Sequence, residues 1–460
     1  MRYVSTRGQA PALGFCDALL AGLASDGGLY VPEQWPLLPA VAPGDAYAKV
    51  AAGVVGAFAG DELSPALLER LCEEAYAEFR HPAICPLVQL DAGEWLLELF
   101  HGPTLAFKDL ALQLVGRLFD HVLTQRDERI TVLVATSGDT GSAAISGLAS
   151  CSRADVVVLY PEGRVSDVQR RQMTTIASPN VHAVAVDGTF DDCQAIVKQL
   201  FGEQAFRERV GLAAANSINW ARVAAQVAYY AWATDALGGR ALTFAVPTGN
   251  FGNVLSGWVA RASGLPVERL VIGSNSNDIL PRLLATGRLE ARGVVPTLSP
   301  SMDIQVSSNF ERLLFELYGR DPERTQRELA RFAETGSLVL DPAPLVALRE
   351  LFEARAFDDA ATLAAMREEH DRSGVLLDPH SALGLAAGRA RSGGRGAPLV
   401  ALATAHPAKF PDAVQRATGI VPALPPALAD LHERPERSER ASADAAAVQR
   451  LVERLVDRPG

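Results

Sequence analysis

Short apolar, β-branched runs alternate with helical patterns from residue 94 onward, and this alternation constrains the fold more than any other feature of the chain. A strand followed by a helix and a second strand forms a right-handed crossover unit, which builds a parallel sheet with helices on both faces. The predicted strands are residues 94–100, 130–136, 155–160, 181–186, 241–247, 269–273 and 398–403. We therefore expect an α/β fold with mainly parallel sheets covered by helices on both faces.

The residues before and after this region have a different character. At 460 residues, the chain is long enough for two or three packed units. Residues 1–85 indicate helical segments joined by turns, including an amphipathic helix over residues 63–80, before Pro82 and Pro86 interrupt the chain. We expect a mostly helical N-terminal domain over residues 1–85, a core over residues 86–425 and a helical tail over residues 426–460.

Charge and cysteine usage argue against several classes of protein. The 54 acidic and 43 basic residues leave a net charge of −11, which disfavours a nucleic-acid or membrane-surface partner. No apolar run reaches the roughly 18 residues of a membrane helix, and Asp17 interrupts the only apolar stretch near the N-terminus. The five cysteines are odd in number and lack metal-ligand spacing, so we expect buried thiols, no metal and a cytoplasmic location.

Lysine is rare in this chain, and only Lys49, Lys108, Lys198 and Lys409 could supply an amine nucleophile, because a guanidinium stays protonated near neutral pH. Lys108 lies in a loop that follows an apolar strand and begins a helix, and its neighbours Phe107 and Leu110 are apolar. Apolar neighbours and the positive helix end would lower the pKa of this amine, as Schiff-base formation with a carbonyl requires. The alternative is a surface lysine whose stem packs on Phe107.

Two further loops join a predicted strand to a helix. Ser137, Gly138, Asp139 and Thr140 could bind a carboxylate or phosphate at a helix start, or they could form a simple capped turn. The second loop could enclose a phosphate with its backbone N–H groups, because glycine permits close approach, or it could be an ordinary turn. Its residues are Gly249, Asn250, Phe251, Gly252 and Asn253.

Polar residues also lie at a third strand end and at the start of a long helix. Thr404 could direct its hydroxyl at a ligand, or it could simply end a strand. Ser217, Asn219 and Arg222 could bind an anionic group, or they could be a helix cap and a solvent-facing arginine. The strand ends together offer an amine nucleophile, a turn that could bind a carboxylate, a loop that could bind a phosphate, and a hydroxyl group. This combination predicts pyridoxal phosphate, a cofactor with an aldehyde and a phosphate.

The chain resembles the threonine synthases, which have a pyridoxal-phosphate fold similar to that of the tryptophan synthase β subunit. The resemblance extends in family order over about residues 1–415, and it is most specific around Lys108 and Lys409. The matching segments are residues 26–32, 100–109, 136–141, 216–219, 249–252 and 404–410. The resemblance implies pyridoxal-phosphate fold type II and a two-lobed catalytic core.

The resemblance also implies roles for the candidate residues. Lys108 would bind the cofactor covalently and then move protons, residues 249–253 would bind the cofactor phosphate, and Thr404 would contact the ring nitrogen. Residues 137–140 would hold the substrate carboxylate. Many members of the wider fold have asparagine at the position of Asp139, where a carboxylate would repel the cofactor 3′-oxygen unless a proton is shared. The substrate phosphate would contact Ser217, Asn219 and Arg222, with Lys409 as a further candidate.

The implied reaction converts O-phospho-L-homoserine and water to L-threonine and phosphate by γ-elimination and β-addition of water, the last step of threonine biosynthesis. The implied enzyme acts on this small molecule as a monomer or homodimer. A serine or threonine dehydratase, or a β-replacing synthase, is an alternative that needs no second phosphate site. A non-catalytic relative is another alternative, which the presence of Lys108 and the phosphate loop disfavours.

Overall fold

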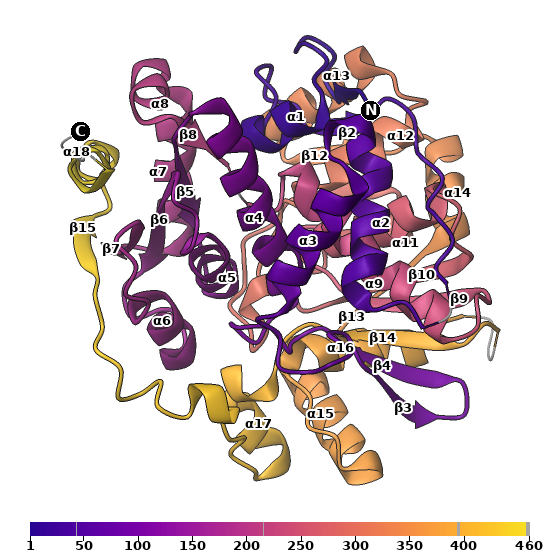
Figure 1. The fold of residues 1–460 in the computed structure, drawn as a ribbon. Coiled ribbons are helices and arrows are strands. Elements are labelled where there is room, and N and C mark those ends of the chain that lie inside the picture. The colour runs from indigo at the N-terminus through magenta and orange to yellow at the C-terminus, as the bar shows by residue number, and fades with distance from the viewer. Residues whose placement is uncertain (43, 215, 393–395, 457–460) are drawn as a thin grey trace.

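The computed structural model describes residues 1–42, 44–214, 216–392 and 396–456, and two sheets organise these residues (Figure 1). The larger sheet has the strand order β13 (Phe352–Ala356), β10 (Val267–Ser274), β9 (Leu242–Pro247), β14 (Leu399–Ala403), β4 (Glu94–Glu98) and β3 (Leu87–Asp91). The smaller sheet has the order β15 (Glu439–Ser442), β7 (Val181–Asp187), β6 (Ala154–Pro161), β5 (Ile130–Ala135) and β8 (Leu212–Ala213). Within these sheets, β3 with β4 is the one antiparallel pair among the described residues. The predicted, mainly parallel α/β fold is confirmed.

Alternating side chains of the larger sheet enter two different cores. Phe244, Val246 and Leu402 pack in the main core with α9 (Trp220–Ala236) and α10 (Gly252–Ala262). Ala245 and Ala401 face the opposite side, where they pack with α16 (Pro379–Arg389) and α17 (Pro411–Thr418). Since successive side chains of a strand point to opposite faces, helices can cover both faces of this sheet.

The smaller sheet is covered in the same way. Val132 and Val156 face α4 (Lys108–Arg126) and α5 (Asp139–Leu148) in the main core. Leu133 and Val157 face the other side, which α7 (Phe190–Gly202), α8 (Gln204–Val210) and α18 (Ala445–Val456) cover. Figure 1 shows this smaller lobe on the left of the molecule.

The remaining elements surround these two lobes. The N-terminal elements are β1 (Tyr3–Ser5), α1 (Phe15–Ala21), β2 (Tyr30–Pro32), α2 (Tyr47–Ala59), η1 (Gly60–Glu62) and α3 (Pro65–Tyr76). The others are α6 (Asp167–Thr174), α11 (Ile279–Thr286), β11 (Arg288–Glu290), η2 (Pro300–Met302), α12 (Phe310–Leu317), α13 (Pro322–Thr335), β12 (Ser337–Val339), α14 (Pro342–Leu351), α15 (Asp359–Ser373), η3 (Pro407–Lys409) and η4 (Pro426–Leu428). The N-terminal segment is therefore mostly helical, as expected, with one small sheet of β1 and β2 that we did not predict.

The C-terminal tail adds a strand and a helix to the smaller lobe. Leu428 and Leu431 form a small core with Leu105 and Val168, and Glu436 pairs with Arg170 of α6. Beyond this contact, β15 extends the smaller sheet by parallel pairing with β7. Figure 1 shows the tail running along the outside of the molecule from α17 to α18. The expected terminal helix is present, and residues 457–460, the end of the predicted tail, lie outside the described residues.

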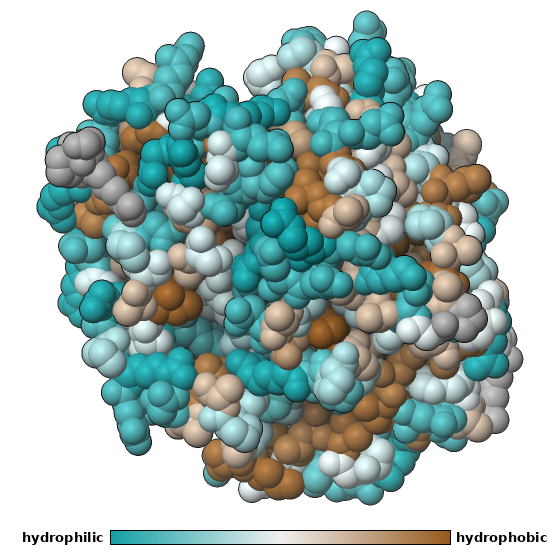
Figure 2. All heavy atoms as spheres, viewed as in Figure 1, coloured by the Kyte–Doolittle hydropathy of each residue, from teal (hydrophilic) through white to brown (hydrophobic). Residues whose placement is uncertain are grey.

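The face shown in Figure 2 is mainly polar, and the cysteines lie in the interior. Figure 2 shows a face that is mainly hydrophilic, with hydrophobic residues gathered in separate patches. All five cysteines are buried and free, as expected. Among the described helices, none is both long and apolar enough to cross a membrane.

Close contact between α4 and α5 fixes the relative position of the two helices that begin in the functional site. A Cβ atom added at Gly116 of α4 would overlap the carbonyl oxygen of Gly147 in α5. We expect Gly116→Ala to lower the free energy of unfolding by about 1–3 kcal/mol, because the helices would have to separate. Denaturant unfolding measures this change. Gly202→Ala is the control: no heavy atom outside its own helix and chain neighbours lies within 4 Å of the added Cβ, so an equal loss there would contradict the packing argument.

Candidate active site

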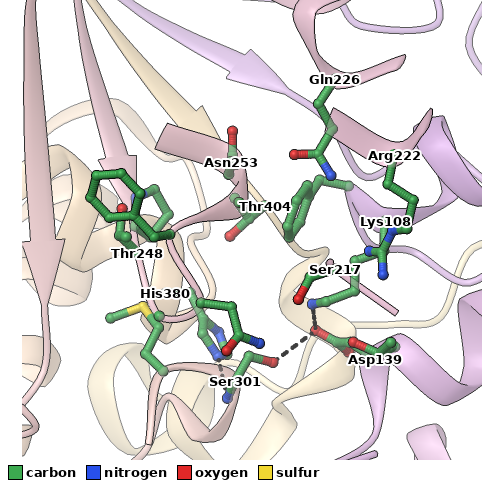
Figure 3. Close-up of a pocket in the computed structure, with 18 residues that line it drawn as sticks. Lys108, Asp139, Ser217, Arg222, Gln226, Thr248, Asn253, Ser301, His380 and Thr404 are labelled. Carbon is green, nitrogen blue, oxygen red and sulfur yellow. Dashed lines mark hydrogen bonds and ion pairs between the residues drawn. The ribbon is translucent and has the colours of Figure 1, made fainter. Parts of the chain in front are cut away.

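One pocket collects most of the predicted site residues at the carboxyl ends of β9 and β14 and the N-termini of five helices (Figure 3). Ligands of open parallel sheets bind at this edge. The lining residues are Phe107, Lys108, Asp139, Thr140, Ser217, Arg222, Gln226, Pro247, Thr248, Gly249, Asn250, Phe251, Gly252, Asn253, Ser301, Met302, His380 and Thr404. These residues come from both lobes and from segments that are distant in the sequence.

Lys108 is the first residue of α4 and is buried, with 9% of its surface exposed, so the surface-lysine alternative is wrong. Its Nζ lies 3.2 Å from Asp139 Oδ2 and 4.8 Å from the centre of the Phe107 ring. Burial lowers the pKa of Lys108, and this effect outweighs the opposite influence of Asp139. A lowered pKa gives the unprotonated amine that attack on an aldehyde requires.

The loop before Lys108 is tied to the loop that follows β14. Phe107 N–H donates to Thr404 O at 2.9 Å, and Ala106 pairs with Ala405 as an isolated antiparallel bridge. Leu105 has a φ of 62°, a left-handed conformation that residues other than glycine rarely adopt. These contacts bring Lys108 and Thr404 into one pocket, as the sequence predicts.

Asp139 begins α5 and accepts four polar contacts, two at each carboxylate oxygen. Oδ1 lies 2.9 Å from both Lys409 Nζ and Gln169 Nε2. Oδ2 lies 3.2 Å from both Lys108 Nζ and Ser301 Oγ. Although burial alone would raise the pKa of Asp139, the two lysines lower it well below its usual range. The carboxylate is therefore ionised.

The predicted phosphate loop lies between β9 and α10. Phe251 is the N-cap of α10 with a φ of 64°, a conformation that turns the chain sharply before the helix. A Cβ at Gly249 would lie 2.8 Å from Ser301 O, so the close approach of these two segments requires glycine. The first N–H groups of α10 have no partner within the helix, and they can bind an anion.

Asn253 adds a side-chain donor to this loop. Its Oδ1 accepts hydrogen bonds from Tyr229 Oη at 2.6 Å and Tyr230 Oη at 3.1 Å. Its Nδ2 is buried and has no hydrogen-bond partner among the described residues. A buried donor without a partner costs free energy unless a ligand satisfies it. The loop therefore fits the phosphate of the expected pyridoxal phosphate.

His380 enters the pocket from the start of α16, and its orientation is fixed. Its Nδ1 lies 2.8 Å from Asp378 Oδ1, and its Nε2 accepts a hydrogen bond from Ser301 N–H at 3.2 Å. Asp378 also accepts from Ser381 Oγ, which in turn accepts from Thr404 N–H at 2.9 Å. One hydrogen-bonded chain thus links His380, Asp378 and the backbone of Thr404.

The structure separates the predicted residues of the helix α9 segment into two groups. Ser217 and Arg222 line the pocket with Gln226, and burial lowers the pKa of Arg222 to about 10. Asn219 is instead the N-cap of α9, and its Nδ2 donates to Leu19 O at 2.8 Å. Asn219 is therefore a helix cap, which was the alternative to anion binding at this position. The buried Arg222 is not the solvent-facing arginine of that alternative.

The remaining predicted residues lie at or just outside the pocket wall. Thr140 lines the pocket beside Asp139, whereas Ser137 and Gly138 do not. Gly138 has a φ of 134° and is the N-cap of α5, so neither Ser137 nor Asp139 caps this helix. Lys409, the further candidate for the substrate phosphate, does not line the pocket and donates to Thr104 O at 2.7 Å.

Sequence reasoning missed Ser301, Met302 and His380. Ser301 and Met302 belong to a segment without a strand or helix pattern, and no local signal marks them. His380 follows Asp378 and Pro379, which together mark the start of a helix. That helix start could have been predicted, but its place beside the pocket could not.

Three family models match successive parts of the chain. "Threonine synthase N terminus" matches residues 2–76, "Pyridoxal-phosphate dependent enzyme" matches residues 81–357, and "Threonine synthase, C-terminal" matches residues 381–452. The second of these covers more than half of the chain and shows that pyridoxal phosphate is the cofactor of the family.

Individual relatives agree with the family models over nearly the whole chain. A threonine synthase of Pseudomonas aeruginosa is 50% identical over 459 residues, which cover 98% of each chain. The crystal structure of a pyridoxal-phosphate-bound threonine synthase from Brucella melitensis is 50% identical, with a TM-score of 0.96 and 100% of each chain covered. Yeast threonine synthase is 36% identical, with a TM-score of 0.90 over 99% of this chain and 98% of that one. The chain therefore belongs to the threonine synthase family of pyridoxal-phosphate-dependent enzymes.

Proposed function

We propose that this pocket converts O-phospho-L-homoserine and water to L-threonine and phosphate, with Lys108 as the catalytic residue. Residues 249–253 and Thr404 would hold pyridoxal phosphate, with Asn253 Nδ2 and the first N–H groups of α10 directed at its phosphate. When bound, this cofactor supplies an electron-accepting ring that stabilises negative charge on carbon atoms of the bound amino acid.

Lys108 moves the protons of the reaction in this proposal. Its Nζ takes a proton from the substrate α-carbon and returns protons at later steps, which requires an amine that is partly unprotonated near neutral pH. Burial favours that state by lowering the pKa of Lys108. Ser301 and Met302 line the same pocket as Lys108.

The observation that carries the proposal is a buried arginine, Arg222, which lines the pocket in addition to the candidate phosphate loop. Arg222 and Ser217 lie on the side of Lys108, whereas Thr248 and Asn253 lie across the pocket (Figure 3). We assign the substrate phosphate to Ser217 and Arg222, with Asn219 supporting them as the helix cap. Of the turn over residues 137–140, Thr140 lines the pocket beside the ionised Asp139, and we assign the substrate carboxylate to Thr140 and the start of α5. Dehydratases and β-replacing synthases need no such second phosphate site.

The ratio of the two products tests this function. Purified protein loaded with pyridoxal phosphate should release inorganic phosphate and L-threonine from O-phospho-L-homoserine in equal amounts. Phosphate without threonine would mean that elimination ends at a keto acid, and the proposed addition of water would be wrong. Absence of phosphate release from an enzyme with normal cofactor absorbance would point to another substrate.

We also propose a domain division at residues 85 and 425, a cytoplasmic location, and a monomer or homodimer in solution. Five buried free cysteines support a reducing compartment. The division at residue 85 falls between α3 and β3, and the division at residue 425 falls just before η4. Sedimentation of the purified chain distinguishes a monomer from a dimer.

A further inference from the structure

Lys409 is a buried cation that the proposed reaction does not use. Its surface is 0% exposed, and it lies behind the pocket wall in η3. Its Nζ lies 2.9 Å from Asp139 Oδ1 and donates to Thr104 O at 2.7 Å. Burial of a lysine ammonium group costs free energy, which the interactions of that group must offset. The chain has only four lysines, and one of them is placed in this costly position.

Asp139 is the group through which Lys409 reaches the pocket. Each oxygen of this carboxylate contacts one lysine and one neutral donor: Lys409 and Gln169 at Oδ1, Lys108 and Ser301 at Oδ2. The two lysines therefore share a single negative charge. With Lys108 alone, the same carboxylate would hold a proton on that amine much more firmly.

We propose that Lys409 is a positioning residue that shares and orients the Asp139 carboxylate, so that Lys108 Nζ can lose its proton near neutral pH. This inference rests on the proposed role of Lys108. It also explains why a carboxylate is tolerated at position 139, since Lys409 still balances that charge after Lys108 has become neutral.

The charged groups around Lys108 act in opposite directions. Burial lowers the pKa of Lys108, Asp139 raises it, and Lys409 and Arg222 lower it. His380 also acts on the Asp139 carboxylate, and Asp109 faces Lys409 from the first turn of α4. Without the positive charge of Lys409, one of the influences that lower the pKa of Lys108 is lost, whereas Asp139 still raises it. The pKa at Lys108 should then rise.

In the cofactor-loaded enzyme, Lys108 Nζ would be bonded to the cofactor, and the pH at which the visible absorbance changes reports the proton on this nitrogen. The charges of Asp139 and Lys409 act on that proton in the same directions as on the free amine, because they stabilise or oppose a positive charge at the same place. We expect Lys409→Met to raise this midpoint by about one pH unit or more, because Lys409 Nζ and Lys108 Nζ contact the two oxygens of the same carboxylate and are therefore close together. Lys409→Arg keeps the charge and should leave the midpoint near that of the wild type. Lys198→Met removes an exposed lysine of α7 and should not move it.

Lys409→Met could fail to fold, because it removes a positive charge beside the buried Asp139 carboxylate. A double substitution keeps the proposal testable in that case. Asp139→Asn should lower the midpoint, and Asp139→Asn/Lys409→Met, which leaves no charge at either position, should lie above Asp139→Asn. An unchanged midpoint in every Lys409 variant, even with reduced activity, would overturn the inference and leave Lys409 a structural residue. If Lys108→Ala retained the wild-type absorbance and its pH dependence, the proposed role of Lys108 would be wrong instead.

Discussion

Replacement of Lys108 by alanine should abolish the release of phosphate from O-phospho-L-homoserine, with a fall in kcat of about 10³-fold or more. Positioned proton transfer contributes about 10²- to 10⁴-fold to a reaction, and this lysine would also hold the cofactor covalently. No other lysine lines the pocket among the described residues. Phosphate and threonine should be measured together, with the visible absorbance of the added cofactor recorded for the same protein.

The rarity of lysine makes the control for this experiment simple. Lys198 is exposed on α7, on the outer side of the smaller sheet, and Lys198→Ala should keep the wild-type activity and absorbance. The thermal midpoint of unfolding should be compared for both variants. Substantial activity in a folded Lys108→Ala protein would assign the proton transfers to another group.

Local patterns predicted the central strands because both faces of these strands are buried in apolar surroundings. The strands β5, β6, β9 and β14 are buried on both faces, and such strands have continuous apolar sequences that are bounded by polar loops. By contrast, β15 has the sequence Glu-Arg-Ala-Ser and lies at a sheet edge, where exposure removes the apolar signal. The short β8 has two residues, too few for any periodicity.

The site was predictable where one loop supplies both the chemistry and its position. Lys108 and residues 249–253 combine a characteristic sequence with a place at a strand end, so local reasoning located them correctly. His380 and Ser301 reach the pocket only through tertiary contacts, such as the hydrogen bond between Ser301 and Asp139, 162 residues apart. The sequence also could not distinguish the cap Asn219 from the pocket residue Arg222, three positions later in the same segment.

Replacement of Arg222 by methionine should weaken the use of phosphorylated substrate while leaving the cofactor in place. A hydrogen bond to a charged group contributes about 1.5–3 kcal/mol, so kcat/KM should fall about 10- to 100-fold. Arg222 is buried, and methionine has a similar length without a charge that must be desolvated, so the protein should fold. Arg222→Lys keeps a charge but loses the planar fork, and we expect an intermediate loss.

Inorganic phosphate separates a direct role in anion binding from a general disturbance of the site. If Arg222 binds the substrate phosphate, inhibition by added phosphate should weaken in Arg222→Met together with the rise in KM. The midpoint of the cofactor absorbance should rise less than in Lys409→Met, because Arg222 lowers the pKa of Lys108 less than Lys409 does. Arg331 is an exposed arginine of α13, and Arg331→Met should leave both properties unchanged. A variant at Arg222 with undiminished phosphate inhibition would move the substrate phosphate elsewhere, because an anion held by a buried guanidinium cannot bind equally well without it.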